Sequence, residues 1–177
     1  MAYLQAATDL LVSDLEEMAK AWEADGAARA AVEADPNAGL LAILTGMGSL
    51  SYGELAGERM KLGLLLNDPE EEQDCFSDNT YNSHYYDGIG MQNVYLGSYQ
   101  RLDGSMVSGP ALADLVAVKD ATVDADLRAK LDATVAALGA IKTAAEGGMA
   151  YDQMLAPGNA EGEALITAGV DALVTQT

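Results

Sequence analysis

Large apolar side chains recur at intervals of three and four residues along most of this 177-residue chain. This spacing places them on one face of a helix, while the charged residues between them fall on the other faces. Alternating β-branched runs, which would indicate strands, are missing. Long amphipathic segments with short connections predict an all-α bundle of four to five main helices. The expected helices span about residues 3–24, 38–66, 83–99, 124–146 and 160–175, with a short helix at 110–118.

Acidic residues outnumber basic residues, with 28 Asp and Glu against nine Lys and Arg and a net charge of −19. This balance excludes the basic surface of a nucleic-acid-binding protein and argues against docking on an anionic membrane. No apolar run reaches the roughly 20 residues that cross a bilayer, so we expect no transmembrane segment. The single cysteine, Cys75, excludes an internal disulfide and a Cys-rich zinc framework. The single histidine, His84, excludes a His-rich metal site within the chain.

Glycines recur at steps of seven, seven and four residues in the second expected helix, at Gly39, Gly46, Gly53 and Gly57. Each glycine costs about 1 kcal/mol relative to alanine in a helix interior. Either another backbone packs very close to this face, or the helix breaks near residues 46–48. Both interpretations place the segment in the centre of the fold.

Polar residues interrupt the same segment at Ser51, Glu54 and Arg59. Ser51 and Glu54 have the spacing of a capping box, with Ser51 as the N-cap and Glu54 at the third helical position. Alternatively, Glu54 and Arg59 project into the centre of the domain. A buried carboxylate there needs a partner charge or a ligand.

A long polar loop is expected at residues 67–82, and loops of this length in compact helical domains are often functional. Its acidic run at residues 68–74 is typical of a solvated loop. The loop also contains the only phenylalanine of the chain, Phe76. We expect Phe76 to anchor the loop in the core and to fix Asp74 and Asp78, because a binding site needs a fixed loop.

His84 and Asp87 lie one helical turn apart after this loop. Two such ligands are too few for a tight metal site by themselves. His84 is therefore either a hydrogen-bonded structural residue or one member of a weak metal site with Glu54 and Asp78.

Three segments of the chain resemble the imelysin family. Residues 50–60 are similar to its Gly-Glu-Arg-Met stretch, residues 74–80 contain the string Cys-Phe-Ser-Asp-Asn-Thr, and residues 90–97 follow in the expected order. The resemblance covers nearly all of the chain. It implies an all-helical protein built from two related bundles and located in the bacterial envelope. The family includes insulin-cleaving metallopeptidases and iron-regulated protein A.

The signature Gly-x-His-x-x-Glu motif of the family does not occur in this sequence. The resemblance therefore implies that residues 1–177 are one domain, equivalent to the second half of the longer architecture. Relatives often carry His where this chain has Gln73 and Tyr81. Their replacement lowers the expected metal affinity and favours harder cations. The sequence leaves the cofactor unknown, and the resemblance makes iron or another divalent cation the candidate.

We therefore expect an imelysin-like domain of a periplasmic or outer-envelope protein that binds a ligand or metal in iron or haem acquisition. Two alternatives stay open. The chain is half of a metallopeptidase completed by an N-terminal bundle with a His-x-x-Glu helix, or it is a structural domain that associates with a second copy. The candidate ligand-binding residues are Ser51, Glu54, Arg59, Asp74, Ser77, Asp78 and Asn79, and the candidate metal ligands are Glu54, Asp78 and His84.

Overall fold

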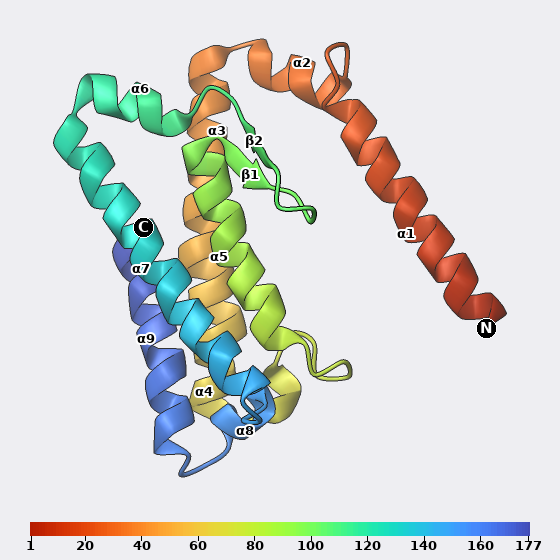
Figure 1. Cartoon of the computed structure of the whole chain (residues 1–177), viewed down its shortest axis with the longest axis vertical. Coiled ribbons are helices and arrows are strands. Elements are labelled where there is room, and N and C mark those ends of the chain that lie inside the picture. Colours follow the sequence, from red (N-terminus) through yellow and green to blue (C-terminus); the bar gives the residue numbers. More distant parts are fainter. The chain divides into compact units, whose positions relative to one another are not determined.

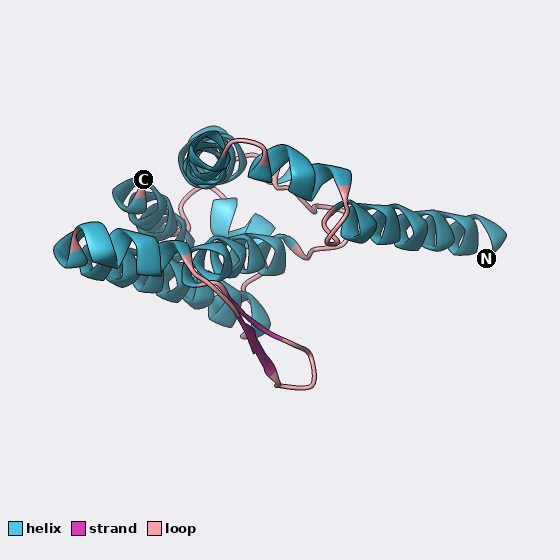
Figure 2. Cartoon of the chain, turned by 90° about the horizontal axis from the view of Figure 1, so that it is seen from above, coloured by secondary structure: helices cyan, strands magenta, loops and turns pink.

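Helices make up about three quarters of the computed structural model, which describes Met1–Thr177 (Figure 1). The only strands form one small hairpin (Figure 2), so the all-α prediction is confirmed. None of the helices has the length and apolar character needed to span a membrane. The chain divides into two units, Met1–Gly46 and Met47–Thr177. The assignment of residues 1–177 to a single domain stays a prediction.

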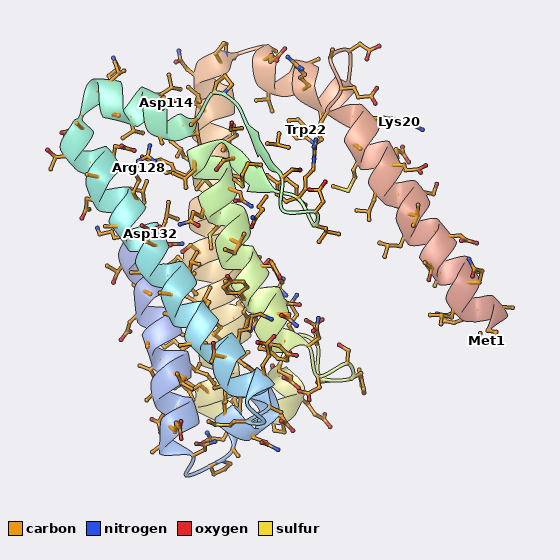
Figure 3. All side chains as sticks on the ribbon, in the orientation of Figure 1. Met1, Lys20, Trp22, Asp114, Arg128 and Asp132 are labelled. Atoms are coloured by element: carbon orange, nitrogen blue, oxygen red, sulfur yellow. The ribbon has the colours of Figure 1, made fainter.

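The first unit contains α1 (Ala2–Ala21), α2 (Ala27–Glu33) and most of α3 (Pro36–Gly48). Asp35 caps α3 by accepting hydrogen bonds from the backbone N–H groups of Asn37 and Ala38. The helix expected at 3–24 is confirmed as α1, yet none of its residues is buried. Its large apolar residues Leu4, Leu11, Leu15, Met18 and Trp22 are all more than half exposed, and Figure 3 labels Trp22 at the end of this helix.

The second unit is a bundle of four long helices: η1 (Ser49–Lys61), α5 (Thr80–Leu96), α7 (Ala121–Glu146) and α9 (Ala160–Gln176). The helix α5 packs against α7, α7 against α9, α9 against η1, and η1 against α5, so the four close a ring. Neighbours in the ring run antiparallel (Figure 1). Fully buried core side chains come from all four helices: Leu55 and Met60, Tyr95, Leu138 and Ile141, and Ile166 and Leu173.

Short elements connect these helices. The helix α4 (Leu62–Leu66) and the 3₁₀ turn η2 (Pro69–Glu71) follow η1, and α8 (Tyr151–Leu155) lies between α7 and α9. The hairpin of β1 (Ser98–Gln100) and β2 (Met106–Ser108) pairs Tyr99 with Val107. It is followed by α6 (Leu112–Lys119), which contacts α7.

The helix η1 is a π-helix of 13 residues that continues directly from α3. Such helices are rare, usually a single turn long, and frequent at functional sites. The capping box proposed for Ser51 and Glu54 is wrong, because Ser51 lies inside this helix and its hydroxyl donates to the carbonyl of Leu173. The chain does not break near residues 46–48 but changes helix type there.

The recurring glycines of this segment do not mark close packing, except at the first one. A Cβ on Gly46 or Gly53 would meet nothing within 4 Å, and one on Gly57 would meet only a carbonyl of its own helix. At Gly39 the backbone oxygen of Val32 would lie 2.4 Å from a Cβ. The prediction of a close-packed glycine face is therefore wrong for three of the four positions.

The tight helix contacts of the bundle lie at glycines outside that row. A Cβ on Gly88 of α5 would lie 2.7 Å from the Leu138 side chain of α7. Gly88 lies on the buried face of α5, which also contains Thr80, His84, Met91 and Tyr95. Tyr86, which lies between His84 and Gly88 in the sequence, is by contrast 60% exposed.

Candidate functional site

Polar side chains from η1, the following loop, α5 and α8 meet at one end of the bundle. Figure 1 shows α4, α8 and the beginning of α5 at this end. The rings of His84 and Tyr151 meet edge to face, with their centroids 5.3 Å apart. The charges of Arg59 and Asp74 shift the pKa of both His84 and Asp87, and the charge of Glu72 shifts the pKa of Tyr151. We call Arg59, Glu72, Asp74, His84, Asp87 and Tyr151 the polar cluster.

His84 is fully buried on α5, and neither ring nitrogen has a hydrogen-bond partner. Burial and, to a smaller extent, the positive charge of Arg59 lower the pKa of His84 from 6.5 to about 4, whereas the charge of Asp74 opposes this shift. The ring is therefore neutral at neutral pH. A neutral imidazole offers one donor and one acceptor, and both are unused here.

Tyr151 and Glu72 are the members of the polar cluster that the sequence did not single out. Tyr151 is fully buried with an unbonded hydroxyl, and burial and the charge of Glu72 raise its pKa. Glu72 is 6% exposed, and its Oε2 has no partner. Burial raises the pKa of Glu72, while a hydrogen bond from Thr80 opposes this. The sequence did not single out Glu72 because it is one of several acidic residues in a row. Tyr151 was missed because it lies in a short helix without an apolar stripe.

Asp74 is held at the beginning of α5 by two contacts. Its carboxylate accepts a hydrogen bond from the Ser83 hydroxyl. Its backbone N–H donates to Thr80 Oγ1 at 2.9 Å. Ser77 lies beside it and donates its hydroxyl to the Asp74 carbonyl at 3.2 Å. The candidate residues Asp74 and Ser77 are thus brought together.

The loop residues from Phe76 to Asn79 are exposed. The Phe76 side chain is fully exposed, so the prediction that it anchors the loop is wrong, and the Asp74 contacts fix the loop instead. Asp78 has a positive φ of 51° and faces solvent. Asn79 precedes α5 and accepts a hydrogen bond from the side chain of Asn82. Of these three residues, only Asp78 influences the polar cluster, because its charge raises the pKa of Glu72.

The candidate residues of η1 separate into two groups. Arg59 belongs to the polar cluster. Glu54 forms an ion pair with Arg59 at 3.4 Å, and the Glu54 carboxylate is half exposed. Ser51 contacts α9 instead: it donates to the Leu173 carbonyl and accepts from Gln176 Nε2, both at 2.8 Å. Since both partners of its hydroxyl lie on α9, Ser51 has a structural role between η1 and α9.

The candidate metal ligands are not brought together as a ligand set. No group of three or more His, Cys, Asp or Glu side chains is arranged to hold a metal ion. His84 is buried, Glu54 is paired with Arg59, and Asp78 is exposed on the loop. The donors of this chain therefore do not fit a metal centre by themselves.

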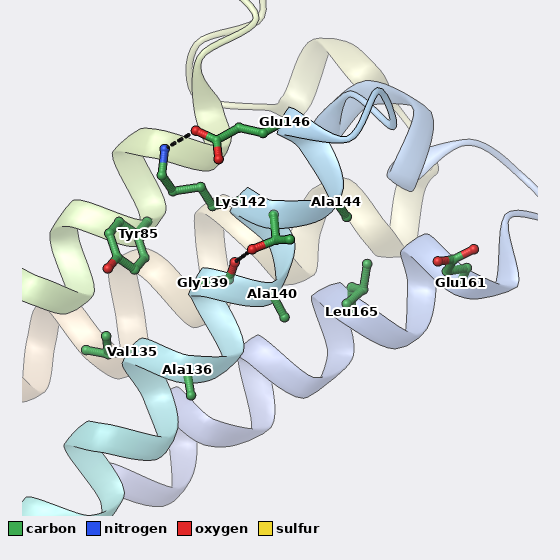
Figure 4. A pocket seen from close by; sticks show the side chains of 11 residues that line it. Tyr85, Val135, Ala136, Gly139, Ala140, Lys142, Ala144, Glu146, Glu161 and Leu165 are labelled. Carbon is green, nitrogen blue, oxygen red and sulfur yellow. Dashed lines mark hydrogen bonds and ion pairs between the residues drawn. The ribbon is translucent and has the colours of Figure 1, made fainter.

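A hollow of about 840 Å³ in the second unit lies over α7 and α9 (Figure 4). Its charged side chains are Lys142, Glu146 and Glu161, and Lys142 binds Glu146 at 2.6 Å. It includes no residue of the polar cluster. Its only cation is already paired, so this hollow offers no free charge for a ligand.

Comparison with known proteins identifies the family. The family model for imelysin, peptidase family M75, matches residues 1–177, which is the whole chain. No curated protein matches the sequence. The match agrees with the all-helical structure and with the motifs at residues 50–60 and 74–80, which supply η1 and the loop of the polar cluster. This chain belongs to the imelysin family.

Proposed function

We propose that this chain is the ligand-binding domain of a periplasmic or outer-envelope protein in iron or haem acquisition, and that the polar cluster contacts the ligand. The observation that carries the proposal is the set of buried polar atoms without partners: Arg59 Nε, Glu72 Oε2, both ring nitrogens of His84 and the Tyr151 hydroxyl. Buried polar groups are nearly always bonded, because an unpaired group costs about 1–3 kcal/mol. Four such side chains at one end of the bundle favour a partner from outside the chain.

The chemistry of the polar cluster favours a neutral ligand with hydrogen-bonding groups. Arg59 donates, Glu72 accepts, and His84 can do either. Charges of both signs are present, so neither a simple anion nor a simple cation is preferred. Because the cluster is not a metal-ligand set, iron would arrive already chelated. Membership of the imelysin family, which includes iron-regulated envelope proteins, supports this role and location.

The proposal is tested with the neutral ferric tris(acetohydroxamate) complex, titrated into the full chain by calorimetry. We expect saturable binding that weakens in Arg59→Gln and in Tyr151→Phe, because each variant removes a donor with no partner in the chain. A lost hydrogen bond to a neutral group corresponds to roughly a two- to tenfold weaker Kd. The gallium complex should bind equally, since the protein contacts the chelator rather than the metal.

Matched variants control for general effects on the protein. Arg29→Gln removes an arginine whose ion pair with Glu33 is exposed, and Tyr52→Phe removes a hydroxyl from a tyrosine that is 60% exposed. Both should bind like the wild-type chain. Absence of binding at millimolar complex, or equal affinity in all four variants, would refute the proposal.

The metallopeptidase alternative has no support from this geometry. It needs a His-x-x-Glu helix that the sequence does not contain, and no residue of the polar cluster is arranged with others as a metal ligand. We therefore favour ligand binding over peptide cleavage as the function of this chain.

A second candidate function, association between copies of the chain, is favoured by α1. This helix of 20 residues has no buried residue, although Leu11, Leu15 and Trp22 share one face. Most of the stability of a helix in a protein comes from packing its amphipathic face, so α1 would gain stability by packing its stripe against a partner. Two copies of one apolar face are self-complementary in an antiparallel pair.

Sedimentation velocity tests this association. The wild-type chain should form dimers at tens of micromolar and the variant Leu11→Glu with Leu15→Glu should stay monomeric. Leu41→Glu, at a residue of α3 that is 66% exposed, is the control and should not alter the dimer. A wild-type chain that is monomeric at all concentrations would exclude this function.

A further inference from the structure

A groove of about 700 Å³ lies between α5 and the β1–β2 hairpin. Tyr85 and Tyr86 of α5 form one wall, and Tyr99 of β1, with Leu102 and Met106, forms the other. The volume lies within the range of about 300–1,000 Å³ that is usual for sites of organic ligands. None of these residues belongs to the polar cluster.

The groove keeps large apolar and aromatic surfaces open to solvent. Tyr86 is 60% exposed, Tyr99 is 52% exposed and Met106 is 60% exposed, whereas Tyr95 and Tyr151 are fully buried in the bundle. Tyrosine rings offer a flat apolar face together with a polar hydroxyl. Two walls of this kind favour a flat ligand that stacks between them.

The charge of the groove is opposite in sign to that of the chain as a whole. Although the chain contains 28 acidic residues, none lines the groove, and Arg101 is its only charged side chain. Arg101 is also the one arginine without an ion pair; the paired arginines are Arg29 with Glu33, Arg59 with Glu54, and Arg128 with Asp124. A free guanidinium beside aromatic rings is suited to a carboxylate, which it binds in a bidentate manner.

The hairpin turn fixes the backbone of Arg101 while its side chain stays unpaired. The Arg101 N–H donates to the Ser105 carbonyl at 2.8 Å, and the Gly104 N–H donates to the Arg101 carbonyl at 2.9 Å. The two strands have only three residues each, and a two-stranded hairpin is marginally stable alone. This wall can therefore adjust to a ligand that reaches Arg101.

We propose that this groove binds a flat, conjugated molecule that carries a carboxylate. The rings of Tyr86 and Tyr99 stack on the conjugated system, and the Arg101 guanidinium binds the carboxylate. A cationic ligand is disfavoured, since no carboxylate lines the groove. The site is separate from the polar cluster, and it stands independently of the function proposed there.

Protoporphyrin IX is the probe for this site, because it is flat, carries two carboxylates and reports binding by its fluorescence. We expect the full chain to bind one molecule saturably. Arg101→Gln should weaken binding of the acid roughly ten- to hundredfold, as expected for a charge-assisted hydrogen bond. The dimethyl ester lacks the carboxylates, so its affinity should not respond to Arg101→Gln.

Three further variants separate this site from adventitious binding. Tyr99→Leu should weaken the acid and the ester alike, because it removes a stacking ring. Arg29→Gln and Trp22→Leu, at an exposed arginine and an exposed tryptophan of the first unit, should bind like the wild-type chain. The proposal is overturned if binding does not saturate, if Arg101→Gln and Arg29→Gln bind the acid equally, or if Trp22→Leu abolishes binding. Unchanged binding in Tyr151→Phe keeps the result distinct from the polar cluster, and circular dichroism checks the fold of each variant.

Discussion

Two buried tyrosines differ in whether their hydroxyl groups have a hydrogen-bond partner. Tyr151 has no hydrogen-bond partner, whereas Tyr95 donates to the Asp124 carboxylate at 2.9 Å. Tyr151→Phe should therefore raise the free energy of unfolding by about 1 kcal/mol, since an unpaired buried group is removed, while Tyr95→Phe should lower it by about 1 kcal/mol. Urea unfolding of both variants checks the two signs. Destabilisation by Tyr151→Phe comparable to that by Tyr95→Phe would show that the Tyr151 hydroxyl has a partner.

The buried imidazole of His84 should make the protein sensitive to acid. The pKa of His84 falls from 6.5 to about 4 on folding, so between these values the unfolded chain binds a proton that the folded chain does not. Stability is therefore fully present above pH 6.5 and decreases as the pH falls toward 4, by about 3 kcal/mol in total. Urea midpoints measured from pH 7 to pH 4.5 should fall less steeply in His84→Gln than in the wild-type chain.

Glu72 titrates in the opposite sense and makes the comparison with the variant necessary. Its pKa is raised in the folded state, so protonation of Glu72 favours folding as the pH falls. The wild-type profile alone therefore contains both effects, and the difference between wild type and His84→Gln isolates the histidine. Parallel profiles would mean that His84 is not neutral and buried in the folded protein.

The sequence predicted the roles of single residues well only where those roles depend on the local sequence pattern. Arg59 and Asp74 were expected to lie near each other, and they flank His84. Tyr151 and Glu72 were missed because their burial depends on the packing of α8 against α9 and the η2 turn, which the local pattern does not reveal. Phe76 was misassigned because a large apolar side chain usually lies inside, and nothing in the sequence reveals that it is exposed here.

Two glycines test which helix contacts are tight. A Cβ at Gly162 of α9 would lie 2.4 Å from Met154 Cα, so Gly162→Ala should lower the free energy of unfolding by about 3 kcal/mol. A Cβ at Gly53 of η1 would meet nothing, so Gly53→Ala should instead stabilise the helix by up to ~1 kcal/mol. Thermal unfolding of the pair measures both, and a loss of stability in Gly53→Ala would indicate that a close neighbour covers η1.

Elements with strong periodicity were predicted best. The helices α7 and α9 carry regular apolar stripes, and both occupy the expected segments within a few residues. The short helices α2 and α8 lack such a stripe and were missed. The hairpin of β1 and β2 was missed because three-residue strands are too short to show alternation. No sequence pattern distinguishes the π geometry of η1 from an ordinary helix.

The net charge of −19 should make the whole molecule more stable at high salt. Like charges repel in the folded state, and raising the ionic strength from 0.1 M to 1 M shortens the screening length from about 10 Å to about 3 Å. The Tm should therefore rise by a few degrees between 0.1 M and 1 M NaCl, as differential scanning calorimetry can measure. KCl at equal ionic strength should give the same shift, and a Tm that falls with salt would mean that attractive ion pairs outweigh the repulsion.

At the scale of the molecule, composition and periodicity predicted the all-α bundle, and the motifs predicted the imelysin family. The division into units at Gly46 was not expected, because it falls within one continuous helical segment. The candidate site was only partly predictable, since it is assembled from η1, a loop, α5 and α8. Residues so far apart in the chain are brought together by packing, which a single sequence does not report.

The π geometry of η1 also bears on how sequences of this kind can change in length. Each i→i+5 ring encloses one residue more than an α-helical turn. A deletion of one residue between Ser49 and Lys61 could be absorbed by one turn reverting to the α form, while α3 and α4 keep their register. Alignment gaps among relatives should therefore gather in this stretch, where the bundle can lose a residue without losing a turn.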